Sequence, residues 1–197
     1  FERLLCATGP TQGRILRPSD LEVPGRIVFV QCVGSRGEGG RPYCSRYCCM
    51  NSVKSAMLAH EHEPDLTECV LLYTDMRAVG RGFDAFVDRC LSREDIRHVR
   101  GRPAKIQEDP DSGNLTLWVE DYRTGRPETL EAGMVVLSTA ALPAKGSSEL
   151  AEILGVEVDG VAAFIPLGDG EAELVDAPRN TVTVVFRFLN GFDELVD

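Results

Sequence analysis

Short apolar runs alternate with amphipathic stretches in the first half of this 197-residue chain. Residues 26–32 and 69–74 are predicted as buried strands: 27–30 form a continuous apolar run, typical of a parallel strand covered on both faces, and a shorter strand is predicted at 96–99. Between these runs, residues 47–60 and 82–93 place apolar side chains at helical spacing. The pattern therefore predicts the order β-α-β-α-β.

After residue 104 the period changes. Short alternating stretches continue to residue 131, separated by turns around Gly113 and Gly125, which predicts an antiparallel meander. The remaining predicted elements are a buried strand at 134–137, a short helix at 147–154 and a hairpin at 178–197. We therefore expect an α/β fold, a Rossmann-like three-layer domain with a central parallel sheet and an antiparallel β-meander.

Composition and charge narrow the classes of function. The chain is 43% hydrophobic and 26% charged, as globular domains are, and its formal net charge is -10. A strongly acidic chain is a poor ligand for nucleic acid or an anionic membrane, so we expect neither partner. No apolar run approaches the roughly 18 residues of a membrane span, and no signal peptide is recognised, so we expect a cytoplasmic location. Because the sequence begins with Phe1, we expect it to be part of a longer protein.

Four of the seven cysteines fall within eighteen residues. Cys32, Cys44, Cys48 and Cys49 follow the pattern C-x11-C-x3-C-C, from the end of the first predicted strand to the start of the first predicted helix. A Rossmann unit normally carries the phosphate-binding G-x-G-x-x-G there, and this loop lacks that spacing. Four thiolates can meet at this position on one soft metal centre. The other three cysteines, Cys6, Cys69 and Cys90, are expected in the core.

A 4Fe-4S cluster is the preferred interpretation of this set. Structural zinc usually takes its cysteines from two C-x2-4-C knuckles, which adjacent Cys48 and Cys49 cannot form. Residues 31–54 also hold four cations and one carboxylate, a local charge of +3 that offsets an anionic cluster. Free buried cysteines and a redox disulfide pair remain alternatives.

The sequence resembles the A-subunit family of heterodisulfide reductase, whose members are iron-sulfur flavoproteins. The motifs that carry the resemblance are Phe1-Glu2-Arg3-Leu4-Leu5, Gly9-Pro10-Thr11, Arg17-Pro18-Ser19-Asp20, Gln31-Cys32-Val33-Gly34-Ser35-Arg36, Pro42-Tyr43-Cys44-Ser45-Arg46, Cys48-Cys49-Met50 with Lys54, Asp75-Met76-Arg77-Ala78, Gly82-Phe83, Arg100-Gly101-Arg102-Pro103-Ala104, Asp109-Pro110 and Leu154-Gly155-Val156. They cover about 155 of the 197 residues.

The resemblance implies a fold, a cofactor set and roles for particular residues. Members of the family resemble thioredoxin reductase, with an FAD domain interrupted by a second Rossmann-like domain of the kind that binds NAD(P) in flavin disulfide reductases. The chain is similar to that second domain, with residues 1–25 as a linker, 26–145 as the cluster-binding domain and 146–197 as a partial return toward the FAD domain. The resemblance implies a 4Fe-4S cluster on Cys32, Cys44, Cys48 and Cys49, and it implies FAD in the full-length protein. It also implies that Lys54, as a catalytic residue, and Glu2 approach this FAD.

The function implied is that of an oxidoreductase, namely an electron-transfer module that relays electrons to or from FAD, as in flavin-based bifurcation. The partners implied are the other components of a heterodisulfide-reductase-like complex, with ferredoxin or hydrogenase and dehydrogenase electron donors. Two alternatives stay open: an NAD(P)H-dependent flavin disulfide reductase domain that uses a Cys48-Cys49 or Cys44-x3-Cys48 pair, and a structural zinc-binding scaffold domain.

Overall fold

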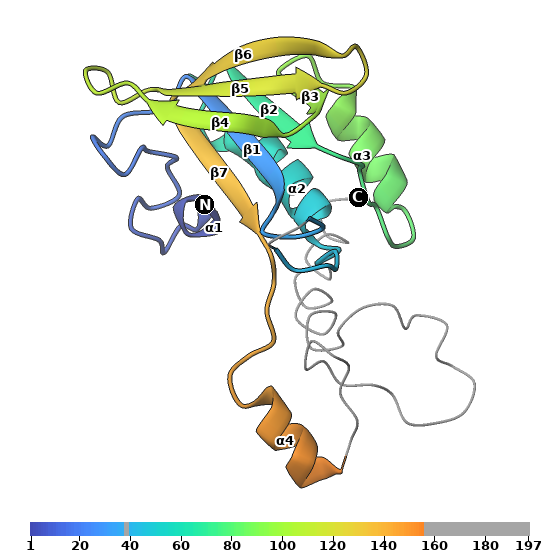
Figure 1. Cartoon of the computed structure of the whole chain (residues 1–197). Helices are drawn as coiled ribbons and strands as arrows, with labels where there is room; N and C mark the ends of the chain where they lie inside the picture. Colours follow the sequence, from blue (N-terminus) through green and yellow to red (C-terminus); the bar gives the residue numbers. More distant parts are fainter. Residues whose placement is uncertain (38–39, 156–197) are drawn as a thin grey trace. The chain divides into compact units, whose positions relative to one another are not determined.

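A computed structural model describes residues 1–37 and 40–155 (Figure 1). The chain divides into two compact units. Of the described residues, the first comprises 1–37, 40–44 and 48–139, and the second comprises 45–47 and 140–155. Both sheets lie in the first unit.

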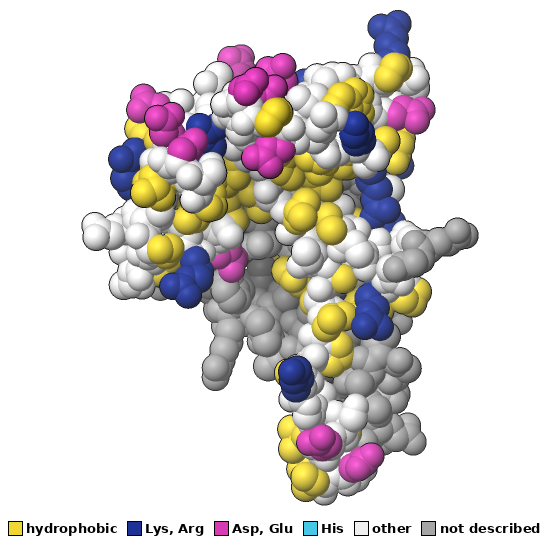
Figure 2. Space-filling model, turned by 60° about the vertical axis from the view of Figure 1, so that its left-hand side comes forward, with side chains coloured by type: hydrophobic (Ala, Val, Ile, Leu, Met, Phe, Trp, Pro, Cys, Tyr) yellow, Lys and Arg dark blue, Asp and Glu magenta, His cyan; other side chains and the backbone are white. Residues whose placement is uncertain are grey.

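Helix α4 (Ser147–Leu154) lies in the second unit and has the bounds predicted for the last helix. It exposes the side chains of Leu150, Ile153 and Leu154. Hydrophobic and acidic side chains accordingly lie next to one another at the lower end of Figure 2, where this helix is drawn. The hairpin predicted at 178–197 lies outside the described residues.

The first unit is built on a four-stranded parallel sheet in the order β3-β2-β1-β7. Its strands are β1 (Arg26–Val33), β2 (Glu68–Tyr73), β3 (Ile96–Arg100) and β7 (Met134–Thr139). The central strands β1 and β2 are buried along nearly their whole length, which explains their continuous apolar sequence. All four strands were predicted, to within one or two residues at each end.

Helices α2 (Cys48–His62) and α3 (Phe83–Leu91) form a layer packed against the sheet. Two thiols mark this packing: Cys69 Sγ of β2 donates to Ala56 O at 3.8 Å, and Cys90 Sγ of α3 donates to Val53 O at 3.9 Å. Both cysteines are fully buried, as predicted. The prediction for Cys6 is wrong. Cys6 is exposed because it ends the four-residue helix α1 (Glu2–Leu5), which has no buried residue.

The antiparallel meander forms the third layer. It consists of β4 (Pro103–Glu108), β5 (Leu115–Asp121) and β6 (Arg126–Ala132), paired in the order β4-β5-β6 (Figure 1). Alternate side chains of the two sheets share one buried cluster: Val28, Val30, Val70, Leu72 and Val99 from the parallel sheet, with Leu117, Val119, Leu130 and Ala132 from the meander. The predicted three-layer α/β architecture is thereby confirmed.

The segment before β1, predicted as a linker, belongs to the first unit and packs against its β1 and α2. The rings of Phe1 and Phe29 meet edge to face at 5.2 Å, and Ile15 is fully buried. Arg14 binds the buried carboxylate of Glu63, just beyond the end of α2, with both Nε and Nη2 at 3.0 Å. Among the described residues, no helix combines the length and the apolar character that crossing a bilayer requires.

Candidate metal centre

The strand order places a topological switch point at the carboxyl ends of the parallel strands. From β1 the chain proceeds to β2 and β3 on one side, whereas β7 pairs with β1 on the other side. The connections therefore reverse direction between β1 and β7, and open α/β sheets bind their ligands at such a switch point. Cys32 lies near the carboxyl end of β1, and Thr139 ends β7. The cysteine motif thus starts where this fold places a ligand.

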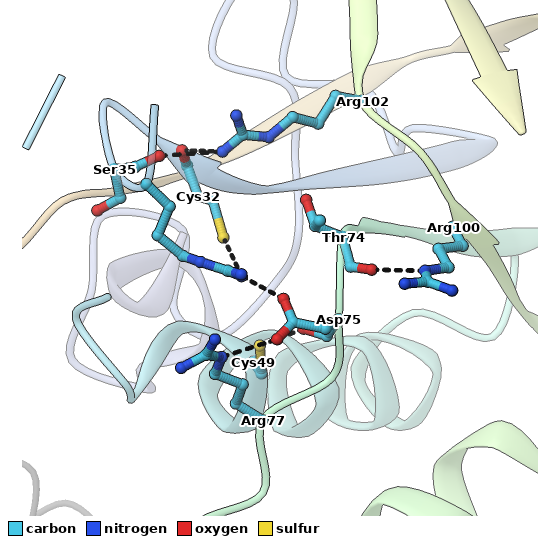
Figure 3. A network of polar contacts seen from close by, with 9 residues as sticks. Cys32, Ser35, Cys49, Thr74, Asp75, Arg77, Arg100 and Arg102 are labelled. Atoms are coloured by element: carbon cyan, nitrogen blue, oxygen red, sulfur yellow. Dashed lines mark hydrogen bonds and ion pairs between the residues drawn. The ribbon is translucent and has the colours of Figure 1, made fainter. Parts of the chain in front are cut away.

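Cys32 adopts an unusual backbone conformation at this edge. Its φ is +59°, in the left-handed region, and the pairing of β1 with β7 shifts register between Val30 and Val33. Such an irregularity changes the direction of a side chain at the end of a strand. Arg102 Nη2 supports the turn by donating to Cys32 O at 2.8 Å and to Ser35 O at 3.0 Å (Figure 3).

The loop after Cys32 folds back on itself. Arg36 N donates to Arg41 O and Arg41 N donates to Gly34 O, both at 2.8 Å. Gly40 is required by this close return, because a Cβ on it would lie 2.8 Å from Gly34 O. The reversal leads the chain toward Cys44, which is half-buried.

Cys48 and Cys49 are the first two residues of α2, and both are buried. Cys48 Sγ donates to Thr139 O at 4.0 Å, at the end of β7, and Cys49 Sγ donates to Asp75 O at 3.8 Å, just after β2. Burial raises the pKa of Cys48 to about 12 and that of Cys49 to about 11, and the charges of Cys32 and Cys44 contribute to both increases. Cys32 and Cys44 therefore lie close enough to Cys48 and Cys49 to affect their pKa values.

The donor set is compatible with a thiolate-bound cluster. Among the described residues, no three His, Cys, Asp or Glu side chains surround one position suited to a single metal ion. A four-iron cube holds its four thiolates farther apart than one ion does, and it takes thiolate ligands, which are what this site offers. Beside Cys32, the buried side chain of Gln31 has no partner for either amide atom, and the buried Ser35 hydroxyl has none. Buried polar atoms that lack a protein partner commonly bind ordered water.

The sequence analysis counted Arg36 among the cations that offset the cluster, but it gave Asp75, Arg77 and Arg102 no place in the site. Arg36 Nη1 donates to Cys32 Sγ at 3.8 Å and also pairs with Asp75 Oδ1, while Arg77 Nε donates to Asp75 Oδ2 at 2.8 Å (Figure 3). Burial by itself raises the pKa of Asp75, but the hydrogen bonds from Arg36 and Arg77 bring it below its ordinary value. In the sequence, Asp75 and Arg77 come just after β2, and Arg102 comes just after β3. A position after a parallel strand was the signal that could have identified them as site residues.

The two residues predicted to approach FAD lie on separate helices. Lys54 is half-buried in the second turn of α2, and Glu2 is exposed at the start of α1. Helix α1 packs against α2. Their role toward a flavin stays a prediction.

Fold and site together define a class of protein: a Rossmann-like α/β domain in which cysteines occupy the place of a dinucleotide-binding loop. The chain is 46% identical over 162 residues to the first iron-sulfur A subunit of the CoB–CoM heterodisulfide reductase of Methanopyrus kandleri, covering 80% of this chain and 24% of that protein. It is 44% identical over 157 residues to the A subunit of the H2/formate:CoB-CoM heterodisulfide,ferredoxin reductase of Methanococcus maripaludis, covering 79% and 24%. Over the aligned residues, the chain belongs to the heterodisulfide reductase A-subunit family.

The chain spans about a quarter of the length of these relatives. No protein-family model matches the chain. Among solved structures, the thioredoxin reductase of Lactococcus lactis aligns with a TM-score of 0.45 at 14% identity, over 72% of this chain and 39% of that one.

Proposed function

We propose that this chain is the electron-transfer domain of a heterodisulfide-reductase-like oxidoreductase, with a 4Fe-4S cluster on Cys32, Cys44, Cys48 and Cys49. The observation that carries the proposal is the position of these residues at the switch point of the parallel sheet: Cys32 lies near the carboxyl end of β1, and Cys48 and Cys49 contact the residues that end or follow β7 and β2. The relatives add support, since one carries the words iron-sulfur in its name. When bound, such a cluster supplies one-electron transfer, and FAD, carried elsewhere in the longer protein, couples two-electron to one-electron chemistry.

The residues of the chain have separate tasks in this proposal. The cysteines would lose their protons to hold the iron, the hydrogen bond from Arg102 to the turn orients Cys32, and the burial of Cys32, Cys48 and Cys49 limits access of water. Lys54 and Glu2 would approach the flavin of the longer protein. With that flavin bound, the domain would exchange electrons with partner subunits or ferredoxin in the cytoplasm, which is the chemistry that flavin-based bifurcation requires.

Oxygen-free purification and reconstitution with iron and sulfide test this proposal. We expect about four irons and four sulfides per chain, with an EPR signal after dithionite reduction. Serine in place of Cys32, Cys44, Cys48 or Cys49 should lower the iron content, since a hydroxyl is a poor replacement for a thiolate ligand. Cys6→Ser is the matched control, because Cys6 is exposed and lies outside the cysteine cluster, and it should load fully.

The same preparation separates the alternatives. Fewer than about two irons per wild-type chain, with equal values in all variants, contradicts the cluster. One zinc and no iron supports a scaffold domain instead. Tight NADPH binding in a titration supports a flavin disulfide reductase domain.

A further inference from the structure

We propose that Arg36 sets the reduction potential of the centre held by the four cysteines, and that Asp75 positions it for that task. This inference rests on the proposed function and extends it to residues outside the ligand set. Arg36 is a cation whose side chain donates directly to a clustered thiol, with Nη1 3.8 Å from Cys32 Sγ.

Asp75 holds the Arg36 guanidinium in place. The carboxylate accepts from Arg36 through Oδ1 and from Arg77 through Oδ2, so both of its oxygens are engaged (Figure 3). Arg36 itself has a φ of +57°, and the backbone hydrogen bonds of its loop hold it in that conformation. Its side chain is 23% exposed, so solvent screens its charge only partly.

Asp75 also connects a second clustered cysteine to the same network. Its carbonyl accepts from Cys49 Sγ at 3.8 Å, and the backbone N–H of Arg77 partly offsets the rise that burial gives the pKa of that thiol. One short segment after β2 therefore contacts Cys49 through its backbone and Cys32 through Arg36. The ligands come from separate segments of the chain, and in the metal-free protein this network joins the segments of Cys32 and Cys49.

The physical effect follows from charge. Reduction adds one negative charge to a thiolate-ligated cluster, and an N–H···S hydrogen bond from a cation stabilises that added charge. Arg36 therefore raises the reduction potential. Arg77 carries the same charge on the same carboxylate, yet its described side-chain bond is to Asp75 and not to a thiol, so its effect is weaker.

The test is a redox titration of the reconstituted protein, followed by EPR, in wild type, Arg36→Gln, Arg36→Lys and Arg77→Gln. We expect all four to hold the same iron. We expect the midpoint of Arg36→Gln to fall by an amount equal to a tenfold change in the reduction equilibrium, about 59 mV for one electron. Arg36→Lys, which keeps the charge but not the planar fork, should fall less, and Arg77→Gln should fall least.

Two results overturn the inference: a wild-type midpoint in the Arg36 variants, or an equal fall in Arg36→Gln and Arg77→Gln, which marks a general charge effect. If Arg36→Gln holds no iron, the midpoints of Arg36→Lys and Arg77→Gln are compared instead. A wild-type midpoint in Arg36→Lys, or an equal fall in the two variants, then overturns the inference. Failure of the proposed function is distinguishable, because the wild-type protein itself then holds no iron.

Discussion

Individual cysteines in this chain differ in their surroundings far more than in their chemistry. Cys6 is exposed, and a hydrogen bond with Thr8 lowers the pKa of its thiol. Cys48 and Cys49 are buried, and burial raises the pKa of Cys48 to about 12 and that of Cys49 to about 11. Because the thiolate is the nucleophile, the two groups should react at very different rates.

Alkylation of the metal-free protein near neutral pH checks this difference. We expect iodoacetamide to modify Cys6 well before Cys48 and Cys49, with the order read from peptide mass spectra at successive times. Raising the pH should accelerate the reaction at Cys48 and Cys49 more than at Cys6, since their thiolate fractions are still small. Faster modification of Cys48 or Cys49 than of Cys6 contradicts the stated difference between their thiol pKa values.

At the scale of elements, the sequence predicted the strands and helices well. The apolar runs of β1 and β2 and the helical spacing of α2 and α3 are local signals, and burial on the two faces of the sheet reinforces them. What the pattern missed was the packing of the segment before β1. Its contacts, such as Arg14 with Glu63, join residues 49 positions apart, which a local pattern does not reveal.

Glu63 gives a pH-dependent test of that packing. Hydrogen bonds from Arg14, and then from Ile15 N, hold its pKa below the ordinary value of 4.5. A depressed folded-state pKa adds stability that is present above pH 4.5 and lost as the pH falls through the folded-state pKa. We expect Glu63→Gln to lower the free energy of unfolding in urea by about 1–3 kcal/mol near neutral pH.

The loss should shrink in acid, where the wild-type carboxylate is protonated too. Glu61→Gln is the matched control, since Glu61 lies two residues before Glu63, in the last turn of α2, and is exposed, and it should change stability little. An equal loss in both variants, or a loss in Glu63→Gln that does not depend on pH, argues against the ion pair as its cause.

For the whole molecule, the net charge of -10 conceals a cationic edge. Arg36, Arg77 and Arg102 gather around the thiols, with Asp75 between two of them. The carboxyl ends of β1, β2 and β7 all contribute contacts to this edge, so a centre bound there ties together strands that the unfolded chain keeps apart. Binding should therefore stabilise the fold.

Thermal unfolding with and without the reconstituted centre measures this coupling. A ligand present at 100 times its Kd adds about 2.7 kcal/mol, which corresponds to a rise in Tm of roughly 5–11 °C for a chain of this length. Cys48→Ser should show a much smaller rise, because it lacks a proposed ligand. An unchanged Tm in loaded wild-type protein contradicts the coupling.

The sequence alone determined the strands, the helices, the meander and the four cysteines of the candidate site, because apolar periodicity and ligand chemistry are local properties. Only the tertiary structure decided which groups meet those cysteines. Asp75 and Arg77 follow β2, and Arg102 follows β3, yet all three join the network around the cysteine segments, because parallel strands end at the same edge of the sheet. The tertiary structure likewise placed Cys6 in solvent, since the short helix α1 buries no residue that could cover it.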